Sequence, residues 1–141
     1  MELISRTAPT LGRVLLAVLF LAAGANKLQS PTATIAYIQQ ADLPLPLIAY
    51  WGSALVEVVG ALLLLLGFQA RLAAAILAAF TVVAAAFFHA DFGNANQTIH
   101  FMKNVAIAGG LIQVVAFGAG PFSLDSRRSL RAAASGMSGK T

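Results

Sequence analysis

The fold is decided by the run from Ile48 to Phe68, which reads IAYWGSALVEVVGALLLLLGF. A transmembrane helix needs about 20 mainly apolar residues, and this run supplies them. Glu57 is its only charged side chain. A carboxylate near the middle of a bilayer costs roughly 2.5–3.5 kcal/mol on insertion scales, so it usually faces protein or trapped water and marks a functional site. The run therefore predicts a spanning helix with an acid turned into the protein.

The composition extends this prediction to the whole chain. The 141 residues are 59% hydrophobic and only 10% charged, with a mean hydropathy of +0.82. A soluble domain of this size has too little interior for so much apolar surface, which predicts an integral membrane protein. The chain has no cysteine. This excludes disulfides, thiol nucleophiles, iron–sulfur clusters and cysteine-type zinc sites within it, so electrons for any redox chemistry must come from a bound cofactor, a diffusible substrate or a partner.

The pattern predicts an all-α, integral membrane four-helix bundle. Four apolar segments place the helices at about 11–27, 48–68, 71–89 and 103–118. Ser30 is a plausible N-cap followed by Pro31, which predicts a short interfacial helix in the first outer loop, ending before Asp42. We expect one domain over residues 1–126 and a basic tail over 127–141, disordered beyond about Arg131.

The basic residues predict the topology. Seven fall on one side of the four helices, and two, Lys27 and Lys103, fall on the other. The seven are Arg6, Arg13, Arg71, Arg127, Arg128, Arg131 and Lys140. This positive-inside bias predicts that both termini are cytoplasmic. The net charge of +4 then reflects topology and contact with anionic lipid, and no nucleic-acid partner is expected. A cleavable signal peptide ending at Ala23–Ala25 is the alternative for the first segment.

The unusual polar residues converge on the outer half of the predicted bundle. Alternating helix directions bring together Lys27, His89, Lys103 and Asn104 at the outer helix ends, above Glu57. We expect Glu57 and His89 to be catalytic through proton transfer. The predicted binding residues are Lys27, Lys103, Asn104, Trp51 and Phe20. Each also has a structural interpretation, such as a snorkelling lysine or a helix cap.

Other polar positions favour structural roles. Arg13 is interpreted as an inner interfacial anchor, with an internal pair as the alternative. Tyr50 and Trp51 are interpreted as part of an aromatic belt, and Gln113 is expected to make one interhelical hydrogen bond. His89, His100 and Asp91 match no strong metal-ligand spacing, so no metal site is predicted.

The ordered motifs resemble the DoxX family of small bacterial membrane proteins over about residues 10–126. The matching pieces are RVLLAVLFLAAGANK at 13–27, EVVG at 57–60, LG at 66–67 with Arg71, FT at 80–81, FH at 88–89, FMKN at 101–104, GG at 109–110 and GAGPFSLD at 118–125. The resemblance implies a four-helix bundle in the cytoplasmic membrane and a loose assignment as an oxidoreductase. Relatives include a subunit of archaeal thiosulfate:quinone oxidoreductase and members of redox-protective membrane complexes. Lys27, Glu57, His89, Lys103 and Asn104 match positions associated with the family pattern.

Three functions fit these observations. The leading hypothesis is a membrane oxidoreductase component that binds a quinone-like or other lipophilic molecule beside Glu57. The second is a non-catalytic scaffold that holds a soluble redox enzyme at the membrane, and the third is a proton-coupled small-molecule exporter. The cofactor is unknown, with a quinone as the candidate. Expected partners are membrane lipids, a lipophilic small molecule, a soluble redox protein and further copies of the chain.

Overall fold

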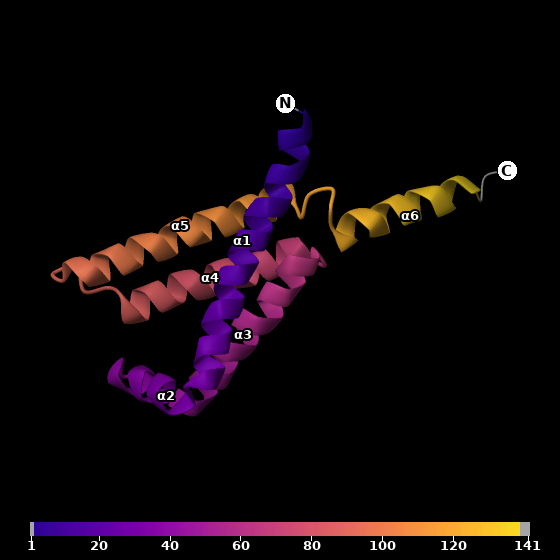
Figure 1. The fold of residues 1–141 in the computed structure, drawn as a ribbon. Coiled ribbons are helices and arrows are strands. Elements are labelled where there is room, and N and C mark those ends of the chain that lie inside the picture. The colour runs from indigo at the N-terminus through magenta and orange to yellow at the C-terminus, as the bar shows by residue number, and fades with distance from the viewer. Residues whose placement is uncertain (1, 139–141) are drawn as a thin grey trace.

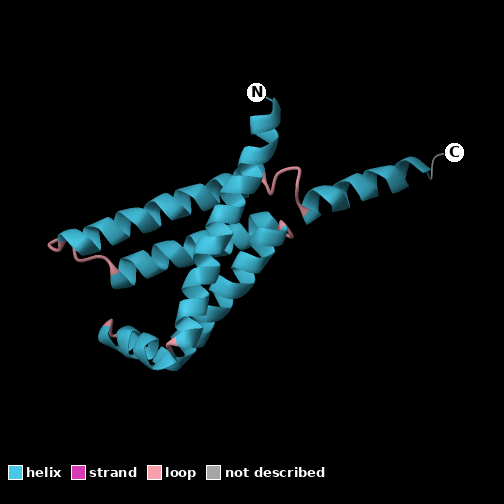
Figure 2. Cartoon of the chain, viewed as in Figure 1, coloured by secondary structure: helices cyan, strands magenta, loops and turns pink. Residues whose placement is uncertain are grey.

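The computed structural model describes residues 2–138, which contain helices and no strand (Figure 2). Six helices follow in chain order: α1 Glu2–Gln29, α2 Pro31–Gln40, α3 Pro46–Leu66, α4 Ala70–Phe88, α5 Ala95–Phe117 and α6 Leu124–Ser138. Of these, α1, α3, α4 and α5 are long and apolar enough to cross a membrane. This confirms the predicted all-α architecture with four candidate spans and a short helix after the first.

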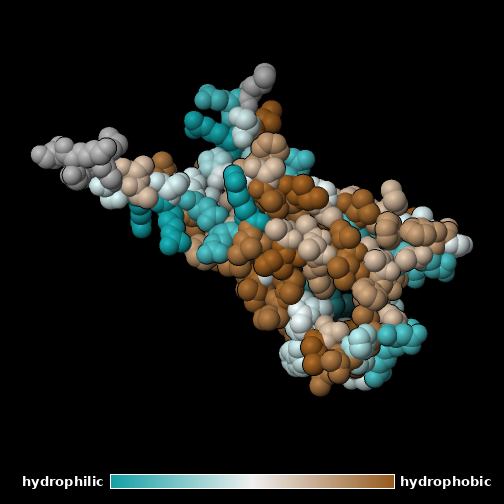
Figure 3. Space-filling model, turned by 180° about the vertical axis from the view of Figure 1, so that it is seen from behind, coloured by the Kyte–Doolittle hydropathy of each residue, from teal (hydrophilic) through white to brown (hydrophobic). Residues whose placement is uncertain are grey.

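The four long helices form two side-by-side pairs, α1 with α3 and α4 with α5 (Figure 1). The pairs meet where the short 67–69 turn joins α3 to α4, and they separate toward α2 (Figure 1). We call these two ends of the bundle the turn end and the α2 end. The core between the pairs includes Leu64, Leu77 and Leu111, all fully buried. Figure 3 shows hydrophobic residues over the middle of the molecule and hydrophilic residues toward its ends, as a spanning bundle requires.

Glycines allow the helices to approach closely at two crossings. A Cβ atom added at Gly24 of α1 would lie 2.7 Å from Val58 Cγ2 of α3. A Cβ atom added at Gly60 of α3 would lie 2.9 Å from Leu77 Cγ of α4. Small residues at such contacts are typical of membrane helix pairs, because packing rather than the hydrophobic effect drives their association.

The sequence suggested that Arg13 is an interfacial anchor, but in the structure Arg13 is buried at the turn end. Its Nη1 donates to the carbonyl oxygens of Leu64 and Leu65 at 2.6 and 2.8 Å, and its Nη2 donates to Phe122 O at 2.9 Å. The last carbonyls of a helix have no partner within it, so the guanidinium replaces water at the end of α3. A buried arginine thereby ties α1 to α3 and to the segment before α6.

Asp125 forms a second tie at the turn end. Its Oδ1 accepts from Gln69 N at 2.8 Å and its Oδ2 from Ala70 N at 2.9 Å. These backbone amides open α4, so Asp125 caps that helix from a distant part of the chain. Its own amide donates to Gly67 O at 2.9 Å.

Helix bounds differ from the predictions mainly where polar flanks continue a helix. α5 begins at Ala95 rather than near 103, because Asn94 Oδ1 caps it by accepting from Asn96 N at 2.9 Å. α2 begins at Pro31 as predicted, although the Ser30 side chain makes no capping hydrogen bond.

Where a disordered tail was expected, α6 continues to Ser138 and extends away from the bundle (Figure 1). Its alanines, from position 132 to 134, have high helix propensity. Lys140, counted in the charge bias, lies outside the described residues.

Candidate functional site

A cavity of about 570 Å³ lies at the α2 end, lined by residues of α1, α2, α3, α4 and α5. Its walls are largely apolar and include five aromatic rings, those of Phe20, Tyr37, Phe80, Phe87 and Phe88. The volume is within the usual range for small-molecule sites, about 300–1,000 Å³. Such walls suit a flat ring or a short apolar chain.

One ion pair supplies the charge in this cavity. Lys27 Nζ of α1 lies 2.5 Å from Glu57 Oε1 of α3. The Glu57 side chain is 6% exposed and that of Lys27 is 24% exposed. The second carboxylate oxygen, Oε2, is buried and has no hydrogen-bond partner among the described residues. The ammonium also lies 5.9 Å from the centroid of the Phe80 ring, within cation–π range.

The close approach of α1 and α3 positions this pair. A Cβ atom at Gly24 would lie 2.7 Å from Val58 Cγ2, so the missing side chain lets α1 approach α3 next to Glu57. Lys27 follows Gly24 by three residues and is therefore on the same face of α1. The Tyr50 hydroxyl of α3 donates to Lys27 O at 3.2 Å and ties the end of α1 to α3.

His89 lies at the end of α4 and lines the same cavity. Its Nδ1 is 2.6 Å from Gln97 Oε1. An amide oxygen can only accept, so Nδ1 is the donor in this contact. The ring stacks on His100 with centroids 5.1 Å apart. Asn104 of α5 adds an amide to the lining.

Helix α2 covers part of the cavity, which the sequence did not predict. Thr34, Tyr37 and Ile38 of α2 line it. The Tyr37 ring stacks on Phe88 of α4, with centroids 5.2 Å apart and planes 17° apart. These three residues have the spacing of one helical face, and that spacing was the available signal.

The structure brings together five of the seven predicted site residues. Glu57, Lys27, Phe20, His89 and Asn104 all line the cavity. Lys103 does not, because it is exposed and one position from Asn104, about 100° around the helix. Trp51 does not line it either: its ring is 59% exposed and packs edge-on against Tyr50. Tyr50 is buried instead of forming part of an aromatic belt.

Comparison with known proteins places this constellation in a family. The sequence profile of the DoxX family matches residues 8–90, which include Lys27, Glu57 and His89. This chain belongs to the DoxX family. It is 34% identical over 116 residues to the inner membrane protein YqjF of Escherichia coli K12, covering 80% of this chain and 85% of that protein. It is 30% identical over 123 residues to the inner membrane protein YphA of the same strain, covering 83% and 87%. No solved structure matches.

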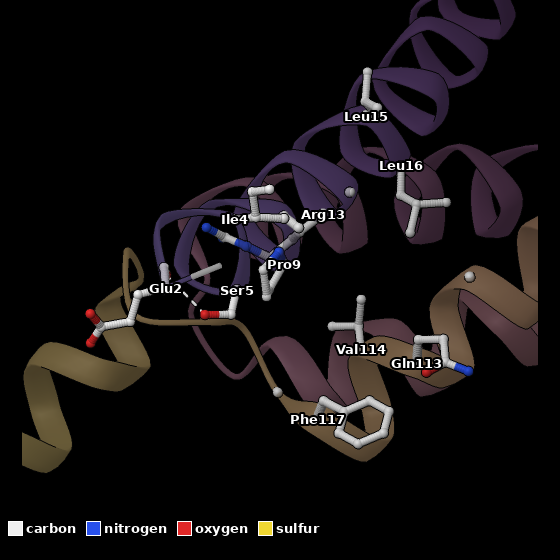
Figure 4. Close-up of a pocket in the computed structure, with 14 residues that line it drawn as sticks. Glu2, Ile4, Ser5, Pro9, Arg13, Leu15, Leu16, Gln113, Val114 and Phe117 are labelled. Carbon is white, nitrogen blue, oxygen red and sulfur yellow. Dashed lines mark hydrogen bonds between the residues drawn. The ribbon is translucent and has the colours of Figure 1, made fainter.

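A second cavity of the DoxX bundle, about 1080 Å³, lies between α1 and α5 toward the turn end (Figure 4). It offers less chemistry than the first. The Arg13 groups Nη1 and Nη2 are used on backbone carbonyls, and the hydrogen bond drawn there joins Ser5 Oγ to Glu2 O. Gln113 lines this cavity and makes no hydrogen bond within residues 2–138, in contrast to the interhelical bond that we expected.

Proposed function

We propose that this DoxX protein is an oxidoreductase component of the bacterial inner membrane that binds a quinone-like or other lipophilic small molecule in the cavity at the α2 end. Glu57 carries the proton, and Lys27 and His89 anchor the polar part of the ligand. The observation that carries this proposal is the Lys27–Glu57 ion pair inside an aromatic-walled cavity. Two relatives named as inner membrane proteins support the location.

The arrangement suits the chemistry of a quinone. A carbonyl oxygen accepts hydrogen bonds, and the Lys27 ammonium has donors beyond the one used on Glu57. Reduction of a quinone to a quinol takes up two electrons and two protons. In this proposal a partner redox protein supplies the two electrons. Glu57 takes up a proton from water as its pair with Lys27 opens and passes it to the reduced ring, and water supplies the second proton. The aromatic walls hold the ring, and a long apolar tail extends into the lipid.

The ion pair favours this function over export of cations. A cation exporter needs its membrane carboxylate available to the substrate, whereas Glu57 is already paired with Lys27. A neutral ligand with polar oxygens does not compete with the ammonium. In this proposal the cavity lies in the outer half of the membrane and both termini lie in the cytoplasm, which the positive-inside bias supports.

Binding of a short-chain ubiquinone to the purified protein in lipid nanodiscs tests the proposal. Lys27→Met is expected to weaken binding about tenfold or more, since hydrogen bonds from charged groups contribute roughly 1.5–3 kcal/mol. Glu57→Gln is expected to bind the quinone and to lose proton exchange, measured with a pH indicator during chemical reduction. Lys103→Gln is the matched control, because Lys103 is exposed and outside the cavity. No binding by the wild type, or equal binding by Lys27→Met, would refute the proposal.

A further inference from the structure

The turn end of the bundle carries a group of exposed arginines. The guanidinium groups of Arg71, Arg127, Arg128 and Arg131 have no ion pair and no hydrogen bond within residues 2–138. Arg128 packs 5.9 Å from the centroid of the Phe68 ring. Asp125 is the nearby acid, and backbone amides of α4 occupy both of its oxygens. The positive charge at this end therefore remains available to a partner.

The Arg71 side chain lies beside the segment that follows α5. It lies in the first turn of α4 and runs along the backbone of Gly118, which follows α5. A Cβ atom at Gly118 would lie 3.4 Å from Arg71 Nε and 3.6 Å from Nη2. Gly118 has φ +83°, a conformation that other residues rarely adopt. The guanidinium therefore lies within van der Waals reach of the turn at Gly118, and the positive φ explains the glycine there.

This guanidinium borders a cavity of about 620 Å³ between the start of α4, the 118–123 segment and the first turns of α6. Gln69, Ser126 and Ser129 form a polar side together with Asp125, whose oxygens accept from the amides of Gln69 and Ala70. Leu72 and Phe117 form an apolar side that is exposed. The cavity lies where the apolar lengths of α4 and α5 end. A polar wall next to an exposed apolar wall, at the end of the spans, matches the boundary between a lipid headgroup and its acyl chains.

We propose that this Arg71 pocket binds the phosphate of an anionic phospholipid. Arg71 donates two parallel hydrogen bonds to the phosphate oxygens, a geometry that the planar guanidinium favours. Leu72 and Phe117 contact the first carbons of the acyl chains. The arginines of α6 raise the positive potential around the site. A soluble acidic protein would satisfy Arg71 and leave these two apolar side chains in water, so the lipid fits the pocket better.

The test measures lipids retained by the full chain in detergent, using native mass spectrometry with phosphatidylglycerol and phosphatidylcholine in competition. The wild type is expected to select phosphatidylglycerol. Arg71→Gln is expected to lower this selectivity about tenfold, because it removes the charge-assisted hydrogen bonds to the phosphate. Arg71→Lys keeps the charge and loses the paired hydrogen bonds, so its selectivity should fall between the two. Arg131→Gln removes the same charge outside the pocket and should change selectivity less than twofold.

Three results would overturn the proposal. Wild-type selectivity in Arg71→Gln would assign these arginines to another partner, such as an acidic protein. An equal loss in Arg131→Gln would indicate a diffuse charged surface rather than a site. Displacement of bound lipid by millimolar inorganic phosphate, as efficient as by short-chain phosphatidylglycerol, would indicate a site for free anions. Unchanged melting temperatures of the variants establish that a lost preference comes from the pocket and not from unfolding.

Discussion

The ion pair between Lys27 and Glu57 should be strongly coupled, and a double-mutant cycle measures this. The cycle uses Lys27→Met, Glu57→Gln and the double variant. Methionine keeps the length of the lysine stem and glutamine keeps the shape of the acid, so the cycle removes charge with little change in packing. The 2.5 Å separation of the charged atoms and their position in an apolar cavity make this pair the most sensitive electrostatic contact of the fold.

Burial sets the expected magnitudes. Loss of one partner of a buried pair typically costs about 3–5 kcal/mol, because the other charge remains without compensation. Glu57 is the deeper partner, with 6% of its side chain exposed against 24% for Lys27. Lys27→Met, which strands the acid, should therefore reach the upper part of this range, and Glu57→Gln the lower part. The double variant strands neither charge and should lose less than either single variant, which gives a coupling energy of at least about 3 kcal/mol.

The assay is equilibrium unfolding in mixed micelles, followed by far-UV circular dichroism as the fraction of denaturing detergent rises. Lys103→Met, an exposed lysine at the same end of the bundle, is the control and should stay within about 0.5 kcal/mol of the wild type. If the losses of the two single variants sum to the loss of the double variant within about 0.5 kcal/mol, the two charges do not interact. In that case the ion pair would not support a functional site.

Three further changes test the packing around the cavity and the turn end. Gly24→Ala should destabilise the bundle by about 1–3 kcal/mol, because its Cβ atom would lie 2.7 Å from Val58 Cγ2. Gly12→Ala is the control and should not destabilise it, because a Cβ atom there has no neighbour within 4 Å. Thermal unfolding compares the two variants. Asp125→Ala should cost about 0.5–2 kcal/mol through the lost cap of α4, measured by detergent unfolding. Tyr50→Phe should cost about 0.5–1.5 kcal/mol in the same assay by removing its bond to the end of α1.

The sequence was sufficient to predict the main elements of the cavity. The length of the apolar run around Glu57 identified a span, and alternating helix directions brought Lys27 and His89 to the same end as each other. A charged side chain that faces lipid is energetically costly, so the inward orientation of Glu57 could be predicted from that cost alone. Pro31 predicted the start of α2 in the same way, since proline fits the first turn of a helix.

The errors arose where the outcome depended on rotation about a helix axis or on distant backbone groups. Lys103 and Asn104 are neighbours in α5, yet only Asn104 lines the cavity. Side chains of consecutive helix residues point in directions about 100° apart. Trp51 was assigned by depth alone, and depth does not fix the side of α3 on which a ring lies. Arg13 was predicted to lie at the membrane interface, because burying a charged side chain away from water is costly. The carbonyls at the end of α3 offset that cost, and their position was not readable from local sequence.

The two ends of the bundle are built for different tasks. At the turn end, Arg13 and Asp125 fix the helices through backbone groups of α3 and α4, contacts that any separation of the helices would break. At the α2 end, the helix pairs diverge, and the contacts around the cavity are side-chain contacts: the Lys27–Glu57 pair and the Tyr37–Phe88 stack. Side-chain contacts re-form with a ligand at low cost, while lost backbone hydrogen bonds inside a membrane do not. If the proposed ligand binds, we therefore expect it to enter at the α2 end, with the turn end as the fixed base of the bundle.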